Sequence, residues 1–536
     1  MSEAIRKLEW GAAIFRECNK NAILRSSNAT KRLVRYSCDT LKLSADLGVK
    51  LGEAFYEPFA KAMSLPTWST LEAHKLKTQS LRDGVLYPVL AAFENKCAGL
   101  SEEEKHVNIA FDSMKFRKGV AFRRGMLVID GLGTDVAQPG FLVAEYKSHM
   151  KIKETDGKAK DRPPMAQNYM VHYLITATGK ERVIVARHMW SGLDSDRERV
   201  VLDEVICACS ARGFTVIGIG CDGASENRSL AHSDFTEEFE LVEGFSKFKG
   251  YRIHPCDSTK RIYFLSDPMH LVKKIRNALL HSFTTKNRSL RLNGHKLSLA
   301  MLKTAWAKTG GADDGGLNWN KLSRSYFDDL KGAYKMKVYP ACQVLSQGMI
   351  RVINQYCKDG KNIVNQKRTK EYSSLLELCR HMDVFIDILN STTESKQKEV
   401  KSGVYCLSKG AATDTCLDKL SNVLKFFTAW KTSTKCAAEF IPYQSFEDLN
   451  YIIQGNISLF KFYSNMYPNF KWRLACTGSD GCERHFANVK NDSHTGSNPV
   501  VQNILSSVNK SINHNLSKNS SEMSMDRLKM NSKRSR

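Results

Sequence analysis

The sequence predicts a mixed α/β fold, in which a sheet with parallel and antiparallel strands is flanked by helices. Three short apolar runs, HVNIAFD (106–112), FTVIGIGCD (214–222) and RIYFLSD (261–267), are typical of buried strands, and each ends at an aspartate. Two neighbouring apolar runs at 170–179 and 182–190 predict a hairpin. The order strand, hairpin, helix, strand, strand, helix favours a mixed sheet.

Local signals predict two helices in this region. Ser195 and Glu198 have the spacing of a capping box, an apolar stripe follows them, and Gly213 is placed to end the helix. Pro268 suits the first turn of a second helix, MHLVKKIRN, which is basic. Both helices are expected to pack against the sheet that the apolar runs form.

The rest of the chain differs from this β-rich part. We expect a helical region at 1–104, the first part of an α/β core at 105–280, a mostly helical, basic insertion at 281–470, a second part of the core at 471–510 and a disordered basic tail at 511–536. The tail prediction depends on its many Ser, Asn, Lys and Arg residues and its few apolar ones.

Two segments of the N-terminal region allow two interpretations. Residues 51–63 have apolar residues at helical spacing, and residues 65–77 contain a breaker at Pro66, a cap at Thr67 or Ser69, and then a basic helix. A helix-turn-helix that binds DNA fits this pattern. Two packed helices without a special role fit it equally well.

The charge balance points to a polyanionic partner. The chain has 536 residues with 80 Lys and Arg against 56 Asp and Glu, a formal net charge of +24. Such an excess favours nucleic acid, because each neutralised phosphate releases condensed counterions. No apolar run is long enough for a transmembrane helix, and the first residues lack a signal peptide's apolar stretch.

The cysteines predict reduced thiols rather than a metal site. The chain has 15 cysteines and no CxxC pair. We therefore expect core thiols in the nucleus or cytosol and no structural zinc.

Asp112 and Asp222 stand in the same sequence context, because each follows a strongly apolar run. Strand ends of this kind deliver side chains to the edge of a sheet where α/β proteins place their sites. Two carboxylates there would repel each other unless a cation lies between them, and Mg²⁺ (or Mn²⁺) suits oxygen ligands. The alternative is that each aspartate only caps a helix or starts a turn.

Several segments resemble the P-element and THAP-type transposases, and they occur in that family's order. The segments are NIAFDSMKFRKGV (108–120), VIGIGCDGASENR (216–228), YFLSDPMHLVKKIRN (263–277), KMKVYPACQVLSQGM (335–349), MDVFIDILNS (382–391) and GSDGCERHFANVKND (478–492). The resemblance implies an RNase H-like catalytic core, interrupted by a helical insertion, with Asp112, Asp222 and Glu483 as a DDE triad of metal-binding, catalytic carboxylates.

The same resemblance implies a function and partners. The family's activity is Mg²⁺-dependent cleavage and strand transfer of double-stranded DNA at transposon ends, by a nuclear, homo-oligomeric transposase. Its insertion binds GTP in P-element transposase, although this sequence has no clear NKxD motif, and the family's zinc-coordinating N-terminal finger is not found in the sequence. The alternatives are a domesticated, catalytically silent DNA-binding protein and a plain Mg²⁺-dependent nuclease.

Six further residues lie near the predicted carboxylates in sequence. Asp480, one helical turn before Glu483, would support a metal or cap the helix. Asp267 either lies at the rim of the site with His270 or serves as the N-cap of the helix that Pro268 starts. The basic residues of that helix are candidate DNA contacts or a solvated face: Lys273, Lys274 and Arg276.

Overall fold

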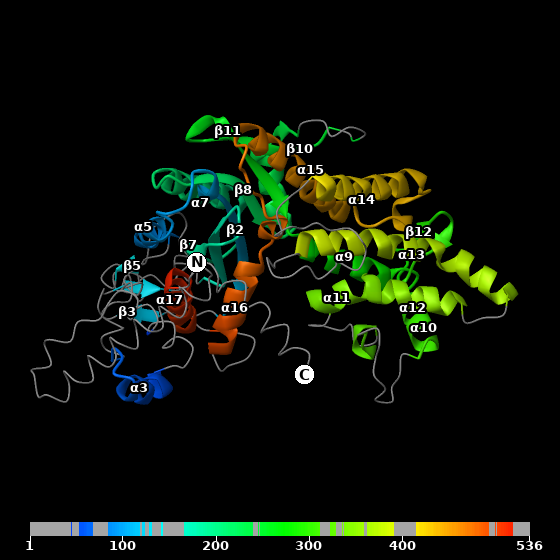
Figure 1. The fold of residues 1–536 in the computed structure, drawn as a ribbon, viewed down its shortest axis with the longest axis horizontal. Helices are drawn as coiled ribbons and strands as arrows, with labels where there is room; N and C mark the ends of the chain where they lie inside the picture. The colour runs from blue at the N-terminus through cyan, green and yellow to red at the C-terminus, as the bar shows by residue number, and fades with distance from the viewer. Residues whose placement is uncertain are drawn as a thin grey trace, which may run out of the picture.

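An eight-stranded sheet lies at the centre of the structure, a computed structural model (Figure 1). The structure describes residue 44 and residues 53–67, 84–117, 121–123, 128–130, 141–142, 166–239, 245, 247–310, 322–327, 335, 337–358, 362–390, 414–492, 499 and 501–517. A smaller sheet is formed by β3 (Ala121–Arg123), β4 (Val128–Asp130) and β5 (Phe141–Leu142).

The central sheet is mixed, as the order of apolar runs predicts. Its strands lie in the order β1-β7-β6-β2-β8-β11-β10-β9. The neighbours β2, β8 and β11 run parallel, and the other neighbouring pairs are antiparallel. The strands are β1 (Gly84–Val85), β2 (His106–Lys115), β6 (Asn168–Thr176), β7 (Arg182–Trp190), β8 (Thr215–Cys221), β9 (Glu237–Glu238), β10 (Lys249–His254) and β11 (Asp257–Ser266). Because β2, β8 and β11 are parallel, their carboxyl ends meet at one edge of the sheet.

Helices pack on this sheet and on one another. Helix α7 contacts β8 and α8, α15 lies along β11 and contacts α9, α16 crosses β2 and β6, and α17 packs on β7 and α16. Their bounds are α5 (Tyr87–Lys96), α7 (Ser195–Ser210), α8 (Ser225–Asp234), α9 (Pro268–His281), α15 (Tyr443–Met466), α16 (Asp480–Asp492) and α17 (Val501–Ser517).

Glycine in β8 allows the C-terminal segment to approach the sheet. A Cβ atom at Gly220 would lie 2.3 Å from the carbonyl oxygen of Thr477, which belongs to the 3₁₀ turn η9 (Leu474–Thr477) before α16. Asn108 of β2 holds the same turn, because its side-chain amide donates to the Cys476 carbonyl oxygen at 3.0 Å. These contacts bring the start of α16, distant in sequence, to the edge where β8 ends.

The predicted hairpin is confirmed, and the predicted capping box is wrong. Strands β6 and β7 pair along their length, with Gly179 at φ 67° in the turn. The N-cap of α7 is Asp194, whose side chain accepts from the Asp196 amide at 2.8 Å. Glu198 does not reach back to the helix start, because its buried carboxylate is hydrogen-bonded to Nε2 of His172 in β6 at 2.6 Å.

A helical lobe extends to one side of the sheet, at the right of Figure 1. It contains α10 (Leu299–Lys308), α11 (Val338–Val344), α12 (Gln347–Lys358), α13 (Asn362–Asn390) and α14 (Asp414–Ser433), and a short hairpin of β12 (Arg291–Leu292) and β13 (His295–Lys296). Helix α15, which the sequence assigns to the insertion, returns to the sheet and packs on β11. The domain boundaries stay predictions.

The two ends of the chain are described in part. Helix α3 (Glu53–Ala62) occupies the first half of the predicted helix-turn-helix, and most of the second half lies outside the described residues. The prediction of a disordered tail from 511 is wrong as far as 517, because α17 continues to that residue. Ile504, Val508 and Ile512 are buried at four-residue spacing. Across the described residues, no helix combines the length and apolar character needed to cross a membrane.

Candidate functional site

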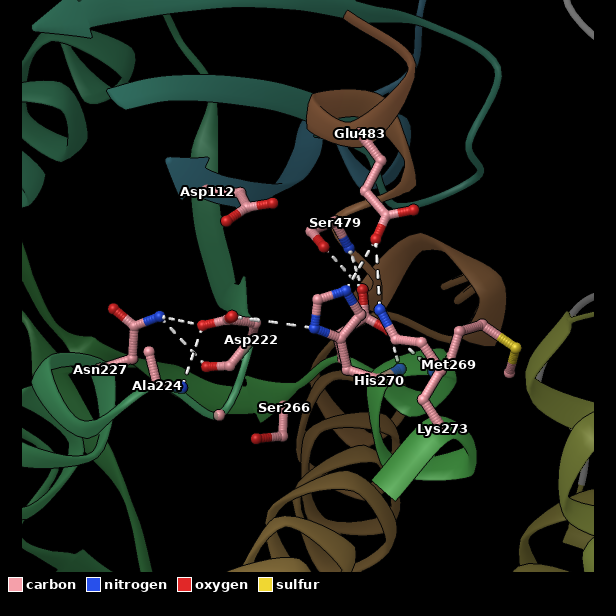
Figure 2. Close-up of polar contacts among 12 residues, drawn as sticks. Asp112, Asp222, Ala224, Asn227, Ser266, Met269, His270, Lys273, Ser479 and Glu483 are labelled. Carbon is pink, nitrogen blue, oxygen red and sulfur yellow. Dashed lines mark hydrogen bonds and ion pairs between the residues drawn. The ribbon is translucent and has the colours of Figure 1, made fainter. Parts of the chain in front are cut away.

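Asp112 lies inside a strand rather than at its end, which corrects the prediction. Strand β2 continues to Lys115 because its pairing with β6 runs on. On its other side, the pairing with β8 stops at Ala110 and Gly220. The Asp112 side chain therefore lies beside the point where the chain leaves β8, and there it meets Asp222 (Figure 2).

Asp222 directly follows β8 and fixes the loop that leads to α8. Its Oδ1 accepts from the Ala224 amide at 3.0 Å and from Asn227 Nδ2 at 2.7 Å. This is the turn-forming geometry that the alternative interpretation predicts. It leaves Oδ2 of Asp222 directed to the other side, toward the His270 ring at 3.8 Å.

The Asp112 and Asp222 carboxyls face each other at this edge of the sheet (Figure 2). Burial, and after it the charge of Asp222, raise the pKa of Asp112 to about 7. The hydrogen bond that Asp112 receives from the Ser113 amide, at 2.7 Å, does not offset these effects. Paired acids of this kind are destabilised as two anions and gain from a cation.

Glu483 comes from α16 and reaches the same edge. His270 bonds to its Oε1 through Nε2 at 2.7 Å, and Lys273 Nζ lies 3.7 Å from the same oxygen. Burial opposes the charge of the His270 ring, but the carboxylates of Asp267 and Glu483 outweigh burial and raise its pKa to about 9. Burial likewise opposes the charge of Glu483, but His270 keeps the pKa of Glu483 below its ordinary value. A charged imidazole therefore stands between Asp222 and Glu483 (Figure 2).

Asp267 serves as the N-cap of α9, as the second of its two interpretations predicts. Its Oδ1 accepts from the amides of Met269 at 2.7 Å and His270 at 3.0 Å. Its Oδ2 accepts from the amide and the hydroxyl of Ser479, both at 2.7 Å. This buried carboxylate joins the end of β11 to the start of α16, so it fixes where Glu483 and His270 lie relative to each other.

Of the remaining candidates, Arg276 and Asp480 lie away from the site and Lys274 lies at its edge. Arg276 is 0% exposed and donates to the Lys335 carbonyl oxygen, so it is not available to DNA. Asp480 lies toward α11, where burial and after it the Asp480 charge raise the pKa of Cys342 to about 12. Lys274 stays at the edge of the site and contacts the carbonyl oxygen of Gly223 at 3.2 Å.

Asp448 of α15 is a site residue that the sequence interpretation missed. It is 2% exposed and accepts from Arg228 at 3.1 Å, from Lys274 at 2.7 Å and from Ser266 at 3.3 Å. Arg228 and Lys274 lie in the helices that follow β8 and β11, and Ser266 is the last residue of β11. One buried carboxylate therefore joins both chain segments beside Asp222. An acidic pair in the otherwise apolar stretch FEDLNYII (446–453) is the signal that could have revealed it.

The donor set fits a hard cation in part. Asp112 and Asp222, with the nearby carboxylates of Asp194, Glu198 and Glu226, line one pocket at this edge. Within the described residues, no group of three His, Cys, Asp or Glu side chains is already arranged as a complete metal site. The Asp112–Asp222 pair can hold an ion, and Glu483 can join them after its carboxylate leaves His270.

The chain is similar to known transposases of the P-element type. No protein-family model matches the chain. Over 292 residues it is 24% identical to the Transposable element P transposase of Drosophila melanogaster, a match that covers 54% of this chain and 34% of that protein. The chain thus spans about one third of that relative's length. The fold matches a chain of the solved Drosophila P element transposase strand transfer complex with a TM-score of 0.62 at 17% identity, covering 92% of this chain and 97% of the other.

Proposed function

We propose that this chain, which belongs to the P-element transposase family, cleaves DNA and transfers strands with a metal-dependent site formed by Asp112, Asp222 and Glu483. In this proposal the central sheet is an RNase H-like core. The observation that supports it is that three carboxylates, separated by more than 100 residues in sequence, come to one sheet edge. Two of them face each other as an acid pair that gains from a cation.

Mg²⁺ or Mn²⁺ is the cation that this donor set would take. Asp112 and Asp222 would hold it through oxygen atoms, with Glu483 as the third carboxylate. When bound, a pair of such ions activates an attacking water or 3′-hydroxyl and stabilises the leaving oxygen of a phosphodiester.

The chain's own side chains would keep these acids in place. Asn227 and the Ala224 amide hold one oxygen of Asp222 and leave the other directed into the site. Asp267 and Ser479 fix the start of α16, which positions Glu483. The His270 ring holds the Glu483 carboxylate at the site in the absence of metal, because their charges attract.

DNA is the substrate that this proposal requires. The net charge of +24 favours a polyanion, and the similar solved structure is a strand transfer complex. We extend the proposal to transposon ends as substrate, to a homo-oligomer and to the nucleus as the place of action. Binding of GTP by the helical lobe stays a prediction, and retention of labelled GTP, with competition by GDP, tests it.

One observation favours a second candidate function. Glu483 is paired with His270 and Lys273, so these two side chains hold the carboxylate that the first candidate function assigns to a metal. A catalytically silent protein that kept the fold and DNA binding would have the same arrangement. A plain Mg²⁺-dependent nuclease would share the acids but not the joining step.

Cleavage of DNA that contains transposon ends, in Mg²⁺ or Mn²⁺, separates these functions. We expect the wild type to cleave and to join products to target DNA, and Asp112→Asn and Asp222→Asn to lose both steps while still binding DNA. Asp257→Asn removes a carboxylate at the opposite end of β11 and serves as the control. Cleavage by either site variant at the wild-type rate excludes that residue as a ligand. A silent wild type supports the DNA-binding protein, and cleavage without joining supports the nuclease.

A further inference from the structure

The loop of residues 222–224 separates two pockets of opposite chemistry. On one side is the pocket that Asp112 and Asp222 line with three more carboxylates. On the other side a second pocket, of about 480 Å³, begins at Gly223 and lies between α8, α9 and the start of α15. We call it the basic pocket, because its lining includes Arg228, Lys274 and Arg288 and no carboxylate.

Two of the three cations, Arg228 and Lys274, are held in place by a carboxylate of α15. Arg228 and Lys274 both pair with the buried carboxylate of Asp448, at 3.1 and 2.7 Å. The cluster lies so close to the loop that a Cβ atom at Gly223 would be 2.3 Å from Lys274 Nζ and 2.6 Å from Arg228 Nη2. Glycine after Asp222 is what allows these cations to lie against the site. Glu447, 3.6 Å from Arg228 Nε, lies on the same buried side.

Arg288 is the cation in this pocket for which the described residues supply no carboxylate partner. Its guanidinium donates to the Phe440 carbonyl oxygen at 2.7 Å, and among the described residues it forms no ion pair with a carboxylate. Burial lowers the pKa of Arg288, so the folded protein holds its charge at a cost. An anion in the pocket would offset that cost.

Neutral donors complete the lining. Ser445 is 2% exposed and borders the pocket, and no hydrogen bond among the described residues uses its hydroxyl. Gln444 offers a side-chain amide beside it. Both lie in the first turn of the 24-residue helix α15, whose N-cap, Pro442, has no side-chain capping bond, so the positive end of the helix dipole faces this pocket.

We propose that the basic pocket binds a backbone phosphate of the DNA strand, next to the phosphate that lies at Asp112 and Asp222. A strand that crosses the loop of residues 222–224 would place one phosphate at the acidic pocket, where a cation is needed, and a neighbouring phosphate among Arg228, Lys274 and Arg288. This inference extends the proposed function, since it names the contact that would align the strand for cleavage.

The test is DNA binding measured by fluorescence anisotropy in EDTA, so that no cleavage occurs. We expect Arg288→Gln to weaken binding by about tenfold, because a charge-assisted contact to phosphate is lost. It should also reduce the slope of log K against log salt by about 0.9. The matched control is Arg212→Gln, since Arg212 follows α7 at the opposite edge of the sheet and pairs with Glu94 at 2.9 Å.

A series of oligonucleotides, each with one phosphate replaced by a neutral methylphosphonate, locates the contact. The wild type should lose affinity when one particular phosphate of the series is neutral, and Arg288→Gln should lose little further affinity at that same position. Such non-additivity is the sign of a direct partner. Equal effects of Arg288→Gln and Arg212→Gln would overturn the proposal, as would additive losses along the whole series. If inorganic phosphate competes with DNA but no methylphosphonate position lowers the affinity, the pocket binds a free anion rather than the DNA backbone. That result would also overturn the proposal.

The test distinguishes this inference from the proposed function. Because binding is measured in EDTA, a wild type that cannot cleave leaves the methylphosphonate result interpretable. Conversely, normal binding and cleavage by Arg288→Gln would refute the phosphate contact and leave the carboxylate site intact.

Discussion

Replacing Asp112 with Asn should stabilise the metal-free protein above neutral pH. The carboxyl has an ordinary pKa of 3.8 in an unfolded chain, and in the folded protein burial and the charge of Asp222 raise it to about 7. The folded state therefore binds this proton more tightly and loses stability as pH rises from about 4 to about 7. The full difference corresponds to about 4 kcal/mol. Solvent reaches this half-buried group and reduces the energy difference. We therefore expect Asp112→Asn to raise the free energy of unfolding by about 1–3 kcal/mol at about pH 8 and to leave it unchanged at about pH 4.

Denaturant unfolding in EDTA measures this gain, and Asp387→Asn is a matched control. Burial, and after it the charge of Asp383, raise the pKa of Asp387 in α13 to about 7 as well. Both variants should therefore gain stability in the same pH window. Mg²⁺ at about 100 times its Kd should raise the free energy of unfolding of the wild type and of Asp387→Asn by about 2.7 kcal/mol, but not that of Asp112→Asn. The reasoning is refuted if Asp112→Asn has the pH slope of the wild type, or if Mg²⁺ stabilises it equally.

Three further predictions follow from other parts of the structure. Gly223→Ala should lower the melting temperature and abolish cleavage, because its Cβ would displace Lys274. Gly99→Ala is the control and should melt like the wild type, because no atom lies within 4 Å of the added carbon. Equal melting temperatures of the two variants would contradict the close approach of Lys274 to Gly223. Diamide should crosslink Cys207 of α7 and Cys256 of the turn between β10 and β11, because these residues are exposed and their Sγ atoms lie 3.4 Å apart. Peptide mapping would detect the crosslink, and its absence would place α7 away from that turn. DNA affinity should fall steeply with salt in a titration, since each phosphate contact contributes about −0.9 to the slope, and a flat dependence would point to an apolar or acidic partner.

The strands and the acids at their ends could be predicted because they depend on local pattern. Apolar runs that end at Asp222 and Asp267 do correspond to β8 and β11, and Pro268 does start α9. The mixed sheet followed from the order of these runs. Such signals are contained in a few consecutive residues, so one sequence is enough to reveal them.

The errors arose where a distant segment determines the local structure. Strand β2 extends past Asp112 because β6 continues beside it. Glu198 leaves the helix start because its carboxylate is hydrogen-bonded in the core to the ring of His172, which lies on strand β6. The capping role fell to Asp194, whose extended backbone, at φ −149°, suits an N-cap.

The electrostatic partners of the acids could not be predicted from the sequence either. His270 was placed only at the rim, whereas the fold of α9 against α16 puts its ring between two carboxylates. Asp448 lies more than 170 residues from Lys274 and Arg228, its two cationic partners. Pairing across such separations depends on how α15 returns to the sheet, and no local pattern encodes that.

The central claim is that Asp112, Asp222 and Glu483 hold the metal that cleaves DNA, and anomalous scattering from Mn²⁺ in crystals of the protein with DNA tests it most directly. We predict an anomalous peak between the Asp112 and Asp222 carboxylates, with Glu483 turned from His270 toward the ion and a DNA phosphate in contact with it. The same peak should be missing in Asp222→Asn. Mn²⁺ bound elsewhere, with Glu483 still paired to His270 in the presence of DNA, would contradict the account.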